Sequence, residues 1–129
     1  MDLPRTGIEY AKWIVEANVP PEDGVTIALL RRYAQRPTSS TTYLPGEWEG
    51  PATTHTVPDP TNPRATVTVF RRVLRLLVAG PDVSAEELAE AAGSGTPPVV
   101  LAAGEHRPWI RWDDAPEDVV RRGGVLHVR

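Results

Sequence analysis

The sequence predicts an α+β domain, in which a small mixed sheet packs against helices and a long Pro/Thr-rich loop is ordered. Three observations lead to this class. Residues 1–36 contain helix-type start and stop signals, residues 64–70 alternate like a strand, and residues 37–63 hold six prolines and seven threonines without an apolar run. Because the chain has 129 residues, we expect one domain, with a helical part over 1–36, a Pro/Thr-rich arm or loop over 37–63 and an α+β part over 64–129.

The first expected helix covers Ile8–Ala17. Thr6 and Glu9 have the spacing of a capping box, and neither glycine nor proline interrupts the segment that follows. Tyr10 and Trp13 belong to a second apolar strip outside the main apolar face. We therefore expect this helix to be covered by the core on one side and by a neighbouring subunit at Tyr10 and Trp13.

A second helix is expected over Pro21–Gln35. Proline and two acidic residues suit its first turn, and arginines suit its last turn. The β-branched residues that follow Gly24 favour an alternative, a strand over Val25–Leu30.

The Pro/Thr-rich loop contains an apolar group formed by Tyr43, Leu44 and Trp48. Pro45-Gly46 lies between two short β-prone runs and predicts the turn of an exposed hairpin. Aromatic side chains on such a hairpin are typical of protein interfaces. The alternative is that Trp48 folds back and fixes the loop to the body of the domain.

The second half of the chain predicts alternating elements. Arg64–Phe70 has a strict period of two and is expected to be a strand. Ser84 and Glu87 form another capping box, with Gly93 as the stop signal. In chain order we expect a strand at 64–70, helices at 73–78 and 84–93, strands at 99–101 and 109–112, a helix from 114 to 123 and a terminal strand at 125–128, with the sheet drawn mainly from these residues.

The string Leu76-Leu77-Val78-Ala79-Gly80-Pro81-Asp82-Val83-Ser84, followed by Glu87-Leu88-Ala89-Glu90-Ala91-Ala92-Gly93, resembles the first two helices of a winged helix-turn-helix domain. The resemblance covers residues 67–93 and implies a third, recognition helix in the DNA major groove. Ser94–Pro98 departs from the pattern, because it does not suit the start of that helix.

A local basic cluster offers a contact for nucleic acid or another anion, and its members are Arg64, Arg71, Arg72 and Arg75. A solvated surface is the alternative interpretation of the cluster. The net charge of −3 does not favour a nucleic-acid partner.

No catalytic, cofactor or metal-binding motif is present in the sequence, and cysteine is absent. The three histidines are His55, His106 and His127. Acidic residues lie near His106 in the chain, so a small enzyme with a histidine–carboxylate site is one alternative function.

The sequence as a whole favours a non-enzymatic interaction or assembly subunit without a cofactor. Its partner would be a protein, either a second copy or another subunit of a structure such as a phage neck or tail. A winged-helix regulator is the alternative from a different class. The first residues lack a signal-peptide pattern, and the longest apolar run, Pro97–Ala103, is too short to span a membrane, so we expect a cytoplasmic or virion location.

Overall fold

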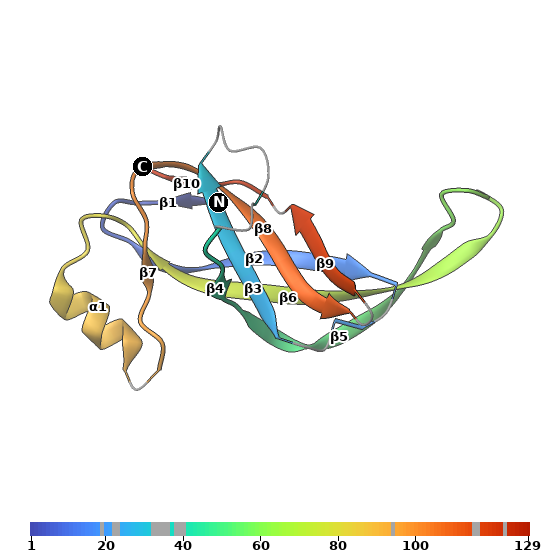
Figure 1. Ribbon diagram of the computed structural model, residues 1–129, viewed down its shortest axis with the longest axis horizontal. Helices are drawn as coiled ribbons and strands as arrows, with labels where there is room; N and C mark the ends of the chain where they lie inside the picture. The colour runs from blue at the N-terminus through green and yellow to red at the C-terminus, as the bar shows by residue number, and fades with distance from the viewer. Residues whose placement is uncertain are drawn as a thin grey trace.

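The computed structural model describes residues 1–18, 20–21, 24–31, 37, 41–93, 95–114, 117–122 and 124–129; for 31, 113, 114 and 117–122 it describes the backbone alone. Most of this described chain is β-strand, and its one helix has eight residues (Figure 1). The prediction of an α+β domain with packed helices is therefore wrong. The protein is a mostly β structure built from two sheets.

A six-stranded sheet forms one layer. Its strand order is β1-β10-β8-β3-β4, and β9 pairs with β8 as well. The pairings are antiparallel except for β1 with β10, which brings the first and last strands of the chain together. The bounds are β1 Asp2–Leu3, β3 Val25–Arg31, β4 Leu44–Pro45, β8 Gly104–Asp114, β9 Glu117–Arg122 and β10 Leu126–Val128.

A four-stranded sheet forms the other layer, and its strands cross those of the first (Figure 1). Long antiparallel strands in the order β2-β6-β5 make up most of it, and β7 pairs in parallel with the end of β6. The bounds are β2 Ile8–Ala17, β5 Glu47–Pro58, β6 Thr66–Ala79 and β7 Val99–Val100.

The hydrophobic core lies between the two sheets. Trp112 and Ile27 of the six-stranded sheet, and Leu74 and Val78 of the four-stranded sheet, are at most 2 % exposed and belong to one cluster. Strands from both halves of the chain supply this cluster, so the expectation that the sheet comes mainly from 64–129 is also wrong. Burying one face of each sheet is the driving force that holds the layers together.

The segment 8–17, predicted to be a helix, is strand β2. Its side chains alternate: Ala11 and Val15 are buried, and Trp13 packs against the core, whereas Tyr10 and Ile14 are exposed. The second apolar strip of the expected helix is therefore divided, because Tyr10 and Trp13 lie on opposite faces of the strand. Ile, Val and aromatic residues favour this conformation, and pairing with β6 over the whole of β2 stabilises it.

Two further helix predictions, at 73–78 and 114–123, are wrong for a similar reason. Residues 73–78 continue strand β6, where Leu74, Leu76 and Val78 point alternately into the core. Residues 117–122 form β9, which is paired with β8 from Asp114↔Glu117 onward. Tertiary pairing overrode the local helix signals in both segments.

The predictions that hold are those with one clear local pattern. Helix α1, Ala85–Ala92, begins after Ser84, whose Oγ accepts a hydrogen bond from the Glu87 backbone N–H at 3.2 Å. The strands expected at 64–70, 99–101, 109–112 and 125–128 correspond to β6, β7, β8 and β10. The strand alternative at 25–30 corresponds to β3, and the helix proposed there is wrong.

The Pro/Thr-rich segment is mostly strand, so the prediction of a long loop is wrong for residues 44–58. Pro45-Gly46 does not turn a hairpin, because β4 joins one sheet and β5 joins the other. The chain changes layers at Gly46, whose N–H donates to Val25 O at 2.9 Å. A Cβ at Gly46 would lie 2.8 Å from Leu74 Cδ1, so this crossing favours a residue without a side chain.

Candidate protein interface

The β5–β6 hairpin extends beyond the rest of the molecule. Strand β2 ends at Ala17, opposite Phe70, and past this point β6 has only β5 beside it in the described part of the chain. We call residues 55–69 the arm. Figure 1 shows the arm projecting from one end of the molecule, past β2 and past the six-stranded sheet.

The two faces of the arm differ in character. One face carries the paired residues His55↔Val69 and Val57↔Val67, which are half-buried or buried. The other face carries Thr56↔Thr68 and Pro58↔Thr66, and all four of these side chains are exposed. This second set, the threonine face, is a strip of β-branched and proline side chains with no charge.

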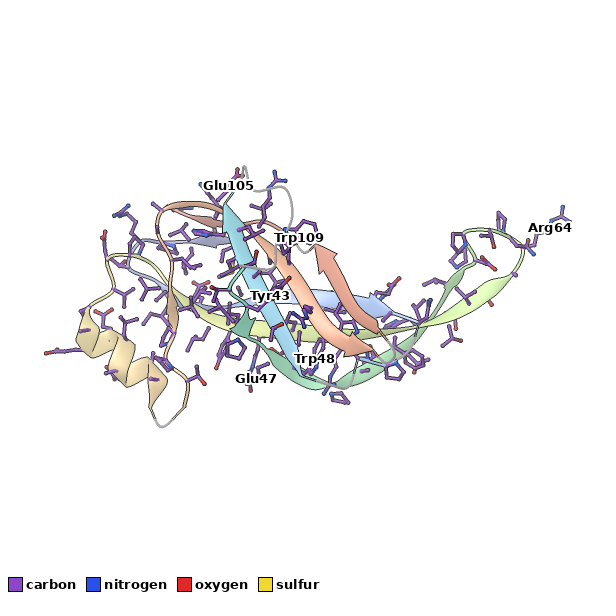
Figure 2. All side chains as sticks on the ribbon, in the orientation of Figure 1. Tyr43, Glu47, Trp48, Arg64, Glu105 and Trp109 are labelled. Atoms are coloured by element: carbon purple, nitrogen blue, oxygen red, sulfur yellow. The ribbon has the colours of Figure 1, made fainter. Side chains whose placement is uncertain are left out.

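The tip of the arm is held in a defined turn. Asp59 N–H donates to Ala65 O at 3.0 Å, and Asp59 Oδ1 accepts from the N–H and the hydroxyl of Thr61 at 2.9 and 2.8 Å. The backbone hydrogen bond from Thr61, followed by that from its side chain, lowers the pKa of Asp59. Pro60 and Pro63 restrict the turn further. Arg64 is exposed at the tip (Figure 2).

The arm lacks the support that holds the other long strands. A two-stranded ribbon in water is marginally stable by itself, and its edges present unpaired backbone groups. A hollow of about 460 Å³ lies at the base of the arm, lined by Pro21, Pro51, Thr54, Phe70 and Arg72 among others. The arm therefore presents unpaired strand edges and an exposed face that another molecule would cover.

The aromatic residues predicted as an interface hairpin do not come together on one. Trp48 and Leu44 pack against the protein's own core, and Arg72 lies over the Trp48 ring at 5.1 Å. Tyr43 is half-buried, with Arg111 5.4 Å from its ring centroid. The alternative in which Trp48 fixes the segment to the body of the domain describes this geometry.

Tyr10 and Trp13, the other expected interface residues, lie on opposite faces of β2. Trp13 packs against the core and donates from Nε1 to Gly124 O at 2.9 Å. Tyr10 is 42 % exposed, and the Arg75 guanidinium lies 4.6 Å from its ring centroid. Of these two residues, Tyr10 remains accessible to a partner.

The four arginines predicted as an anion site are not gathered on one surface. Arg71 pairs with Glu16 and Arg75 pairs with Glu47, each at 2.7 Å. Arg72 alternates to the other face of β6 and donates to the carbonyls of Gly50 and Pro21. Arg64 lies far from them at the tip of the arm (Figure 2). This arrangement gives no continuous basic patch.

The helix pair implied by the winged-helix resemblance is absent, because its first member is the end of β6. Within residues 95–107 the described chain contains β7 and the start of β8, where a recognition helix would be needed.

Among the side chains that the structure describes, no histidine forms a site with a carboxylate in a cavity. His106 is buried beside a cavity of about 300 Å³, and its Nε2 lies 2.8 Å from Ala102 O, a backbone carbonyl. His55 Nε2 lies 2.8 Å from the Thr53 hydroxyl. The pair of His127 and Asp2, at 3.3 Å, lies on the surface, with both side chains more than half exposed.

Sequence reasoning expected an arm or loop at 37–63 but missed the hairpin of 55–69, although a signal was available. The β-branched residues after Ala52 mirror those of Thr66–Phe70 across a turn rich in Asp, Asn and Pro. This symmetry is typical of a hairpin with strands at 53–58 and 66–71. The high proline content of the segment concealed it.

Comparisons with protein-family models, curated proteins and solved structures found no match for this chain. In the ranges that the structure describes, no helix has the length and apolar character needed to cross a membrane. The same ranges contain no group of three or more His, Asp or Glu residues placed to bind a metal ion.

Proposed function

We propose that this protein is a structural subunit of a multi-subunit assembly, which binds a neighbouring protein subunit through its arm. The observation that carries the proposal is the projection of the β5–β6 hairpin beyond β2 and the six-stranded sheet, with an exposed threonine face. A virion neck or tail is the setting that we propose by analogy.

The physical argument concerns the cost of an uncovered hairpin. The body of the protein already has a continuous core, to which the arm contributes no member of the main cluster. Thirteen residues beyond the His55↔Val69 pair are ordered without a third strand to support them. Covering them would bury apolar methyl groups and satisfy backbone groups at the edges, which favours binding to a protein surface.

The test is the mass of the purified chain in solution, measured by light scattering over a range of concentrations. A shortened variant replaces residues 56–68 with Asn-Gly, so that a two-residue turn joins the register partners His55 and Val69. We expect the intact chain to self-associate and the shortened chain to be a monomer. If the intact chain and the shortened chain are both monomeric at every concentration, self-assembly through the arm is contradicted.

A further inference from the structure

A groove at the opposite end of the molecule offers a surface for the arm. Its volume is about 500 Å³, and it lies between the C-terminal turn of α1 and the four-stranded sheet. Ala91 and Ala92 form one wall, and Tyr10, Leu77 and Val99 are among the residues that form the others. We call this the α1 groove. Helix α1 and the arm lie at opposite ends of the longest axis in Figure 1.

Helix α1 is incompletely packed against its own chain. None of its residues is buried, although Leu88 and Ala92 are half-buried on one side. The groove beside it is mainly apolar, with the Glu47–Arg75 ion pair as its charged element. An apolar groove of this kind is suited to a short, rigid and largely uncharged segment.

The tip of the arm has those properties. Pro58, Pro60 and Pro63 limit its conformations, so that little entropy is lost when it binds. Proline rings pack well on aromatic side chains, and Tyr10 is exposed in the groove wall. The dimensions also agree, since a cavity of this size accepts a few side chains and not a whole sheet.

One charged group of the arm tip suits the surface beside the groove. Residues 80–99 contain four acidic side chains and no basic one, and Asp82 is already paired with Arg5 at 2.7 Å. Glu86, Glu87 and Glu90 therefore give α1 an acidic surface. The tip has one carboxylate and one guanidinium: Asp59 accepts hydrogen bonds within its own turn, whereas Arg64 is exposed. An orientation in which Arg64 faces the carboxylates of α1 is therefore favoured.

We propose that the arm tip of one copy occupies the α1 groove of a second copy, an inference that rests on the proposed function of the arm. Each chain then has one arm to donate and one groove to fill, at opposite ends. Two copies that exchange arms form a two-fold dimer, whereas a contact made in one direction only forms a larger closed ring or an open filament.

The experiment blocks each surface separately. The shortened chain described above lacks the tip but keeps the groove. Ala91→Trp fills the groove from an exposed position of α1, and Ala89→Trp is the matched control on the same helix, at a residue that does not line the groove. Light scattering measures the mass of each chain alone, and of the shortened chain mixed in equal amounts with the Ala91→Trp chain.

We expect Ala91→Trp to weaken self-association about 30-fold or more, the effect of losing a central interface contact. The Ala89→Trp chain should assemble like the wild type. The mixture of the two blocked chains should give a complex of two chains and nothing larger, because one intact arm meets one intact groove.

Other outcomes separate the two proposals. If the shortened chain is a monomer while Ala91→Trp assembles like the wild type, the arm binds elsewhere; the groove proposal is then overturned, and the arm proposal stands. If the wild type is itself a monomer, the groove proposal and self-assembly through the arm both fail. Should Ala91→Trp not fold, as judged by circular dichroism, Thr96→Trp fills the same groove from an exposed loop residue and decides the question.

Discussion

Gly80, at the end of β6, shows how strongly a single residue is constrained in this fold. A Cβ there would collide with the backbone carbonyls of Arg5 and Pro4, which have no side-chain freedom with which to move away. We expect Gly80→Ala to lower the free energy of unfolding by about 2 kcal/mol or more. Urea denaturation measures this. Gly24→Ala is the control, since a Cβ there meets no atom within 4 Å, and an equal loss in both variants would contradict the account.

Arg72 and Arg71 are neighbours with different roles. The Arg72 guanidinium donates to two carbonyls and lies over the Trp48 ring. Both contacts depend on a planar group with several N–H donors, which lysine lacks. Arg71 makes a surface ion pair with Glu16. We expect Arg72→Lys to cost about 1–2 kcal/mol of stability and Arg71→Lys less than about 0.5 kcal/mol. Thermal unfolding of both variants checks the order, and a reversed order would show that these contacts are misassigned.

At the scale of elements, the arm should be separable from the stability of the body. None of residues 56–68 belongs to the main core cluster, and the buried Val69 is kept in the shortened variant. We therefore expect the free energy of unfolding to change by less than about 1 kcal/mol when these residues are replaced by Asn-Gly. Denaturation of the monomeric chains measures this difference. A loss of several kcal/mol would mean that the arm supports the core.

The turn before β2 is joined to the turn after β6 by Arg5 and Asp82. The side-chain hydrogen bond from Arg5 lowers the pKa of Asp82, and a hydrogen bond from Arg75 does the same for Glu47. A carboxyl whose pKa is lowered by folding stabilises the folded state at every pH above its pKa in the unfolded chain, which is about 3.9 for Asp. This stabilisation is lost as the pH falls through the pKa of the carboxyl in the folded protein.

The resulting prediction concerns acid stability. The free energy of unfolding should fall between pH 5 and pH 2, and by less in Asp82→Asn than in the wild type. Arg5→Gln should reduce the pH dependence in the same way, because the pKa of Asp82 then returns toward its usual value. Denaturant unfolding at several pH values tests this. An unchanged pH dependence in both variants would contradict it.

The sequence predicted elements well where one local signal acted alone. The Ser84 cap and the run of Ala and Glu define α1, and the alternation before Phe70 defines the first part of β6. Sequence-based prediction failed where the apolar pattern of a segment fitted a helix as well as a strand. Ile8–Ala17 carries apolar residues in two strips of a helix and on both faces of a strand, and only pairing with β6 determines that it is a strand.

At the scale of the whole molecule, the layers depend on contacts between distant residues. Strand β1 pairs with β10 at the other end of the chain, and the crossing at Gly46 places β4 and β5 in different sheets. No local pattern contains such pairings. The candidate site could not be predicted from local patterns either, because the arm and the α1 groove depend on where the strands end in space. The predicted residues Tyr10 and Arg64 lie at these two surfaces, whereas Trp13, Trp48 and Arg72 hold the body together.

Hydrogen–deuterium exchange of the unaltered chain measures the covering of the arm without a substitution. The backbone amides of 55–57 and 66–69 are followed at a high concentration and after dilution. We predict slow exchange in the concentrated sample and fast exchange once the subunits separate, while the core strands stay protected at both concentrations. Equal exchange of the arm at the two concentrations would contradict a role in subunit binding.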